Sequence, residues 1–426
     1  AASITWDGGG TTESWDDPLN WSTDTVPGTA DIAVFDGTSD KNAVIASDVE
    51  VGGIQMDSGY DGTVLTATGR LTVGNSDFIM NSGTNGSFLA TGATIDLDDR
   101  LTIDGGTFTS TQSGMLIDGN FTVGSSGTFN HHSGTVIFEA GSANLNVDTS
   151  EEFYNVIIDK TSGNTHVIAS GDRMIVKNHT ILRDGTLQTG TLEVWGDIEQ
   201  ETDWDGNSAT ATIDFGSASA QTYYVQGGDT PIVEFDEAAD ASDALVMSGI
   251  DLDMYGLSIT SGFSGTVPIN LGTGSLTILN GGYTQAAGTL VAPVLPATMT
   301  VSSANFTKTG GEFVQGTGTV IFAVGSATLN VATSEEFYNV IIDKANGNSH
   351  VIASGDRMIV KNHTILRDGT LQTGTLEVWG DIEQETDWDG NSATATIDFG
   401  SGAAQTYYVG GGDTPIVEFD EAADAS

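Results

Sequence analysis

The sequence contains no cysteine, which excludes disulfide bonds, thiolate-bound zinc and a cysteine nucleophile. Basic residues are also scarce, since 12 lysines and arginines face 58 aspartates and glutamates and the formal net charge is −46. A surface this acidic repels phosphate backbones and anionic lipid headgroups, so we expect neither a nucleic-acid partner nor binding to a membrane surface. Because no run of about 18 apolar residues is present, no membrane-inserted helix is expected either.

Residues that favour strands and turns fill the chain instead. Apolar residues make up 38% of the 426 positions, which is too many for a disordered chain. There are 56 glycines and only 7 prolines, and Thr, Ser and Asn are abundant. β-Branched residues suit a pleated sheet, and Gly and Asn suit turns. Segments such as 209–215 alternate small or apolar residues with polar residues, which is the period of a strand. The sequence therefore predicts an all-β protein.

A long internal repeat dominates the sequence. Residues 135–242 recur as 319–426 at a constant offset of 184, with ten differences over 108 aligned positions. A finer repeat lies beneath it: a short apolar strand is followed by Gly and then by an aromatic residue, as in 101–108, 121–129 and 276–283. Short strands that recur every twenty-odd positions, each bounded by turns, predict a solenoid in which each coil stacks on the next.

We therefore expect a right-handed parallel β-helix of roughly nineteen coils, each of about 22 residues. The expected organisation is an aromatic-rich N-terminal cap over 1–50, solenoid coils over 51–134, repeat copy 1 over 135–242, divergent coils over 243–318 and repeat copy 2 over 319–426. Tandem immunoglobulin-like β-sandwiches are the alternative, because the repeat offset is close to twice the length of one such domain. Against this alternative, the repeat shows no half-period echo and no Cys–Trp core pair.

Two stretches resemble a known class of proteins. The pattern GTVIF…FYNVIIDK…VIASGDRMIVKNHTILRDGTLQTGTLEVWGDIE is similar to the repeats of large secreted bacterial β-helical surface proteins. The opening TWDGGGTTESWDDPLNWSTDTVPGTADIAVFDG, residues 5–37, is similar to the N-terminal segment of the same proteins. The resemblance implies a β-helix at the bacterial surface or outside the cell, and it implies no activity.

Two acidic turns are candidate cation sites. Each places three oxygen-bearing side chains at alternate positions around a glycine: Asp203, Asp205 and Asn207 in copy 1, and Asp387, Asp389 and Asn391 in copy 2. Ca²⁺ prefers six to eight oxygen ligands, so calcium is the one cofactor that the sequence suggests. The glycine stands at position four, whereas an EF-hand loop has it at position six. The competing interpretation is a plain acidic turn between coils.

The tryptophans form a second group of candidates: Trp6, Trp15, Trp21, Trp195, Trp204, Trp379 and Trp388. Exposed indole rings beside Asp and Asn would suit sugar binding. For the first three we favour a cap over the open end of the solenoid, which would otherwise present unpaired strand edges. For the two pairs in the repeat, both interpretations stay open.

No residues stand out as a catalytic set. Adjacent His131 and His132 point to opposite faces of a strand, and no His-x-His spacing of a zinc site occurs. Glu151 and Glu152 fail as paired carboxylates for the same reason. We therefore predict that the chain is not an enzyme.

These observations predict an extracellular structural protein. Our first hypothesis is a self-assembling subunit of a bacterial filament, sheath or surface layer, which polymerises head to tail through unpaired strand edges. The second is an adhesin or glycan-binding stalk with surface glycans as partners. The third and weakest is a polysaccharide lyase or hydrolase, because duplication of a nearly identical unit is explained more directly by lengthening a scaffold.

Overall fold

A computed structural model describes residues 1–161, 163–207, 210–216, 219–236, 245–345, 347–391, 394–400 and 403–419. These residues form forty-five strands and one 3-10 turn, η1 (Pro18–Asn20). The chain separates into two compact units, 1–213 and 214–426. This division falls within repeat copy 1. Among the described residues, no helix is long and apolar enough to cross a membrane.

The first unit is built from short strands separated by turns. Its strands are β1 (Ala2–Thr5), β2 (Asp31–Phe35), β3 (Ala43–Ile45), β4 (Val49–Val51), β5 (Gly53–Met56), β6 (Thr63–Thr66), β7 (Arg70–Val73), β8 (Phe78–Met80), β9 (Ser87–Ala90), β10 (Thr94–Leu97), β11 (Leu101–Ile103), β12 (Thr107–Thr109), β13 (Gly114–Ile117), β14 (Phe121–Val123), β15 (Thr128–Asn130), β16 (Thr135–Ala140), β17 (Ala143–Val147), β18 (Ser150–Lys160), β19 (Thr165–Ile168), β20 (Arg173–Gln188), β21 (Thr191–Val194), β22 (Asp197–Gln200) and β23 (Trp204–Asn207). β24 (Thr212–Phe215) spans the division between the units.

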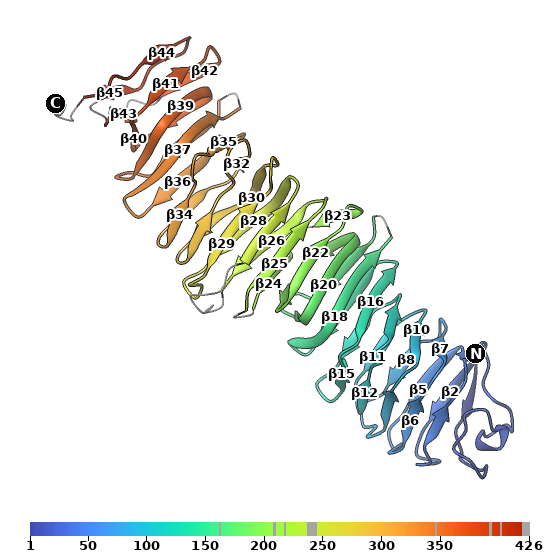
Figure 1. The fold of residues 1–426 in the computed structure, drawn as a ribbon. Coiled ribbons are helices and arrows are strands. Elements are labelled where there is room, and N and C mark those ends of the chain that lie inside the picture. Colours follow the sequence, from blue (N-terminus) through green and yellow to red (C-terminus); the bar gives the residue numbers. More distant parts are fainter. Residues whose placement is uncertain are drawn as a thin grey trace. The chain divides into compact units, whose positions relative to one another are not determined.

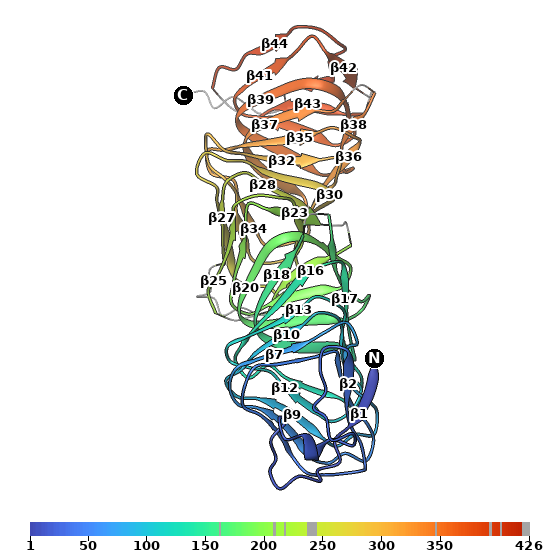
Figure 2. The ribbon, with the colours of Figure 1, turned by 90° about the vertical axis from the view of Figure 1, so that its right-hand side faces the viewer.

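Strands of successive coils lie side by side in the first unit. β2, β5, β8 and β11 follow one another along one face, and β7, β10 and β13 along another (Figures 1 and 2). Leu101 pairs with Phe121 of the next coil, and Phe121 pairs in turn with Leu145 of the coil after that. Each strand therefore finds its hydrogen-bond partner one coil away in the sequence.

The second unit repeats this architecture with some longer strands. Its strands are β25 (Gln221–Val225), β26 (Thr230–Phe235), β27 (Leu245–Gly249), β28 (Leu252–Ile259), β29 (Thr266–Asn270), β30 (Leu276–Gln285), β31 (Thr289–Val291), β32 (Thr298–Ser302), β33 (Phe306–Lys308), β34 (Glu312–Val314), β35 (Thr319–Ala323), β36 (Ala327–Val331), β37 (Ser334–Asp343), β38 (Ser349–Ile352), β39 (Arg357–Gln372), β40 (Thr375–Val378), β41 (Asp381–Gln384), β42 (Trp388–Asn391), β43 (Thr396–Phe399), β44 (Tyr407–Val409) and β45 (Ile416–Glu418). Figure 2 shows β32, β35, β37 and β39 stacked in order.

The core consists of columns of inward-facing side chains. Phe88, Phe108 and Phe129 occupy the same register position in three successive coils, with ring centroids 4.7 and 6.1 Å apart. Offset aromatic stacking of this kind adds to the free energy gained from burial. Alternate residues of each strand point inward, so one apolar residue per coil is enough to extend a column.

The N-terminal tryptophans lie inside the first coils. Trp6, Trp15 and Trp21 are at most 1% exposed and pack against one another and around Phe35. The indole N–H of Trp21 donates a hydrogen bond to the carbonyl of Trp15 at 2.8 Å. These rings are therefore core residues and cannot stack on a sugar.

The parallel β-solenoid predicted from the repeat spacing is confirmed. Every strand pairing assigned among the described residues is parallel, apart from an isolated antiparallel bridge between Trp6 and Trp21. The described residues make about 17 turns, slightly fewer than the expected nineteen. The β-sandwich alternative is wrong, because a sandwich would pair its strands antiparallel.

Candidate functional site

Each repeat copy presents the same outward-facing surface on two long neighbouring strands. In copy 1 these strands are β18 and β20, and in copy 2 they are β37 and β39. In both copies the register shifts near the middle of the strands, between Phe153 and Asn155 and between Phe337 and Asn339. Such an irregularity bends the strands and re-aims their side chains.

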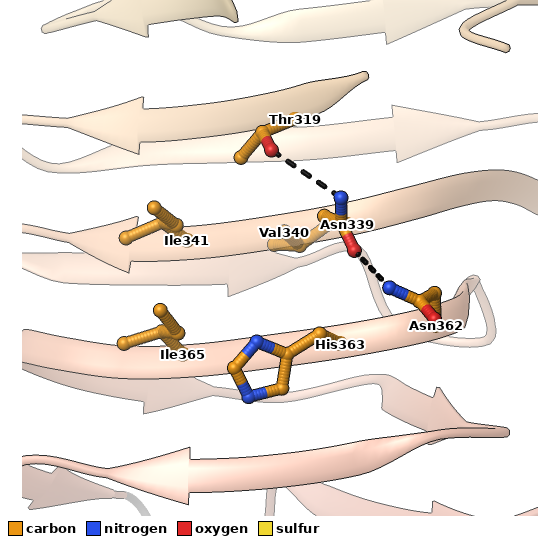
Figure 3. Close-up of a pocket in the computed structure, with 7 residues that line it drawn as sticks. All are labelled: Thr319, Asn339, Val340, Ile341, Asn362, His363 and Ile365. Atoms are coloured by element: carbon orange, nitrogen blue, oxygen red, sulfur yellow. Dashed lines mark hydrogen bonds between the residues drawn. The ribbon is translucent and has the colours of Figure 1, made fainter. Parts of the chain in front are cut away.

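A shallow hollow of about 240 Å³ follows this bend in copy 2. We call it the Asn–Ile groove and define it by the residues that line it: Thr319, Asn339, Val340, Ile341, Asn362, His363 and Ile365 (Figure 3). The matching residues of copy 1, at an offset of 184, are Thr135, Asn155, Val156, Ile157, Asn178, His179 and Ile181. All seven are identical, so the two copies carry the same set of side chains here.

Two columns of side chains give the groove a polar side and an apolar side. Thr319, Asn339 and His363 occupy one register position in successive coils. Two residues further along each strand, an apolar column contains Ile341 and Ile365, which are half-buried. Because strand residues alternate between faces, the intervening Val340 points into the core.

Hydrogen bonds hold the amides of the polar side in place. The Asn362 Nδ2 donates to Asn339 Oδ1 at 2.7 Å, and Asn339 Nδ2 donates to Thr319 Oγ1 at 3.4 Å (Figure 3). In copy 1 the corresponding donor–acceptor distances, Asn178 to Asn155 and Asn155 to Thr135, are 2.7 and 3.2 Å. The amides are therefore pre-oriented in both copies.

Ion pairs border the apolar side. In copy 2, Arg367 contacts the carboxylates of Asp343 and Glu385 at 3.1 and 3.3 Å. The same arginine position in copy 1, Arg183, is paired in the same way with the carboxylates one coil before and one coil after it. These bridges lie on the surface and are partly exposed, so we expect them to fix side-chain positions more than to add stability.

An exposed tryptophan lies near the polar side. Trp379 is 41% exposed, and the Lys361 ammonium lies 3.2 Å from its ring centroid while also pairing with Glu336 at 3.0 Å. The Trp379 indole N–H donates to Glu377. One face of the ring is thus occupied by a cation, which limits its use as a platform for a sugar. Trp195 of copy 1 is equally exposed and lies under Lys177 in the same way.

The second tryptophan of each copy is buried. Trp204 and Trp388 are 2% exposed, and each pairs in register with a glycine of the preceding coil, Gly185 or Gly369. The interpretation of these two residues as sugar platforms is therefore wrong.

In each acidic turn, one aspartate is hydrogen-bonded to the backbone of another turn. Asp205 Oδ2 accepts a hydrogen bond from the Gly163 backbone N–H at 2.7 Å, and Asp389 Oδ2 accepts one from Gly347 N–H at 3.0 Å. The exposed Asp203 and Asp387 lie beside them, whereas the side chains of Asn207 and Asn391 are outside the described residues. In the part of the chain that is described, no three His, Asp or Glu side chains are placed to hold a metal ion. Asp205 and Asp389 stabilise turns between coils.

A buried lysine and histidine in each copy were not anticipated from the sequence. Lys160 and Lys344 are completely buried, and each ammonium donates to a backbone carbonyl of the preceding coil at 2.9 and 3.2 Å. Burial lowers the pKa of both lysines to about 8. Gly369 lies over Lys344 with a φ of +90°, and a Cβ at this position would collide with the lysine stem. Alternation along β18 is the sequence signal that was missed, because a lysine two residues after a buried isoleucine must also point inward.

The accompanying histidines pack as apolar rings. The ring centroid of His166 lies 4.7 Å from that of Phe138, and the centroid of His350 lies 4.6 Å from that of Phe322. Neither ring nitrogen of either histidine has a hydrogen-bond partner among the described residues. Burial, together with the nearby lysine, lowers the pKa of both to about 3, so both are neutral in the folded protein.

Comparison with known proteins finds no family model, no curated protein and no solved structure that matches this chain.

Proposed function

We propose that this chain is an extracellular structural protein of a bacterial surface, a scaffold built by stacking coils that assembles with further copies of itself. The observation that supports the proposal is that the same contacts between neighbouring coils recur in both copies of the long repeat. The two copies repeat their surface ion pairs, amide ladders and buried lysines, and each contact joins residues about one coil apart. In a solenoid such units contact only their neighbours, so copying a unit lengthens the scaffold without designing a new interface.

The negative net charge is consistent with a protein that assembles where salt or divalent cations are available. A net charge of −46 keeps the chain soluble and makes copies repel one another unless salt or divalent cations screen them. We therefore expect assembly to depend on ionic strength.

Electron microscopy of the purified chain tests the proposal. Samples at matched ionic strength, one with millimolar Ca²⁺ and one with a chelator, are expected to contain fibres with a regular axial repeat. Fibres in both samples would show that assembly does not require calcium, and fibres only with Ca²⁺ would show that it does. Single particles at every protein concentration and in both buffers would contradict self-assembly.

Glycan binding is the second candidate function. The observation that favours it is the Asn–Ile groove. This hollow is the candidate glycan site, because Trp204 and Trp388 are buried.

A further inference from the structure

We propose that the Asn–Ile groove of each repeat copy binds a neutral oligosaccharide, so that one chain carries two equivalent glycan sites. This inference goes beyond the scaffold role and holds whether or not the chain polymerises.

The groove matches the two faces of a sugar ring. Pyranose rings carry hydroxyl groups around their edge and C–H groups on their faces. The half-buried Ile341 and Ile365 offer methyl groups to the C–H face, while the polar column beside them offers amide, imidazole and hydroxyl groups to the edge. Binding sites generally combine an apolar lining with a few well-placed polar groups in this way.

Polar atoms in the groove keep hydrogen-bonding capacity for a ligand. Asn362 uses one amide hydrogen on Asn339, which leaves its second amide hydrogen for a ligand. The side chain of His363 makes no hydrogen bond or ion pair with any described residue, although its backbone belongs to the strand ladder. Because the bond to Asn339 already fixes the Asn362 amide, little conformational entropy is lost when it binds a hydroxyl.

The charges around the groove define the class of ligand. In the next coil, Asp381 continues the polar column after His363, and Glu383 continues the apolar column after Ile365. Carboxylates accept hydrogen bonds from hydroxyls and repel sugars that carry carboxylate or sulfate groups. A net charge of −46 acts in the same direction, so the ligand is a neutral glycan.

The direction of the columns defines how such a ligand lies. Equivalent side chains recur at the strand spacing of about 4.8 Å, which is close to the length of one pyranose ring. An oligosaccharide aligned with the stacking direction would therefore place successive sugars over successive coils. A hollow of about 240 Å³ suits a short stretch of sugar chain.

Isothermal titration with three neutral hexasaccharides, built from β-1,4-linked glucose, N-acetylglucosamine and mannose, tests the proposal. At least one is expected to bind with a stoichiometry of two per chain, and hexagalacturonate is expected to bind at least tenfold more weakly. The double variant Asn362→Ala/His363→Ala should reduce the stoichiometry to one, and so should Asn178→Ala/His179→Ala. Combining the four substitutions should abolish binding.

A second surface hollow supplies the matched control. Ser258, Thr284 and Thr307 line a hydroxyl-rich hollow of about 330 Å³ in the divergent coils, which has no asparagine or histidine in its lining. Thr284→Ala/Thr307→Ala should leave the stoichiometry at two. The proposal is overturned if none of the three hexasaccharides binds, if the fourfold variant still binds, or if the anionic hexasaccharide binds best. Concentration-dependent dimerisation that the fourfold variant abolishes would also overturn it, because a second copy of the chain would then occupy the groove.

Discussion

The two repeat copies share their sequence almost completely, yet equivalent residues meet different neighbours. Phe235 of copy 1 is fully buried, whereas its counterpart Phe419 is 78% exposed. Both stack on a phenylalanine of the preceding coil at 5.2 Å, Phe215 and Phe399 respectively. Within the described part of the chain, only Phe235 is also covered from the following coil, by Phe263 at 5.4 Å. Burial in a solenoid is thus decided by the coils on either side of a residue rather than by its own segment.

Glu151 and Glu335, which are equivalent residues of the two copies, also differ because the preceding coil gives them different neighbours. Glu335 forms an ion pair with Lys308 of the preceding coil at 2.7 Å. By strand register, the position of Lys308 is taken in copy 1 by Val123, so Glu151 has no lysine beneath it. Burial raises the pKa of Glu151 to about 7. Burial also raises the pKa of Glu335, but the hydrogen bond and charge of Lys308 oppose the shift.

The largest expected difference between the copies concerns the two phenylalanines. Phe235→Ala should lower the free energy of unfolding by about 4 kcal/mol, because it removes a fully buried ring and leaves a cavity. Phe419→Ala should cost well under about 1 kcal/mol, because most of that ring already faces solvent. Chemical denaturation of the two variants measures both values. Equal losses would show that the following coil does not cover Phe235 in solution.

Replacing the two buried lysines should produce a smaller difference in stability between the copies. Asp118 and Glu139 favour the charged form of Lys160, whereas Ala323 stands where copy 1 has Glu139 and Lys344 has burial alone acting on it. Lys344→Met should therefore stabilise the protein at pH 7 by up to about 3 kcal/mol, from a pKa of about 8 against 10.5 unfolded. Lys160→Met, the matched variant, should gain less.

The pH dependence of Lys344 supplies the check. Because its pKa is lowered in the folded state, the cost of burying its charge is fully present below pH 8 and is relieved as pH rises from 8 to 10.5. Denaturation curves at pH 7 and above pH 10.5 should show the advantage of Lys344→Met at the lower pH only. An equal advantage at both values would assign the effect to packing instead of charge.

The smallest expected effect concerns the two glutamates: replacing each by Gln should change the stability of the protein in opposite directions. The pKa of Glu151 is raised in the folded protein. The free-energy cost of burying its charged carboxylate is therefore absent below about pH 4.5 and grows as pH rises to 7. Glu151→Gln should therefore stabilise the protein above pH 7, by about 1 kcal/mol after allowance for solvent screening. Glu335→Gln should destabilise it, because Lys308 would lose its partner in a largely buried position.

Thermal unfolding of the two Gln variants at pH 4.5 and pH 8 measures these changes in stability. Val123→Lys in the wild-type background is the constructive control, since it should give Glu151 the partner that Glu335 has and lower its pKa. Stabilisation by both Gln variants at pH 8 would contradict an ion pair between Lys308 and Glu335.

Much of the fold followed from local patterns. Alternation along segments such as 101–103, and the glycine-bounded turns between them, predict short strands. Their recurrence at intervals of about one coil predicts the solenoid, and the offset of 184 predicts two equivalent sets of coils. The candidate sites followed less well. For Trp204 the sequence left open whether it is a sugar platform or a capping residue, and its ring is buried. For Asp205 the sequence offered a calcium ligand or a plain acidic turn, and its carboxylate accepts a hydrogen bond from the backbone of another turn.

The sequence by itself determined the strand period, the turns, the repeat and the acidic charge, because each of these depends on neighbouring residues in the chain or on composition. Only the tertiary structure decided that Gly185 lies against the stem of the buried Lys160, that Trp204 is buried, and that amides and isoleucines of separate coils line one groove. The physical reason is the register of stacking. Each side chain is covered by residues one coil before and one coil after it, and bends such as the one after Phe153 shift that alignment by a residue.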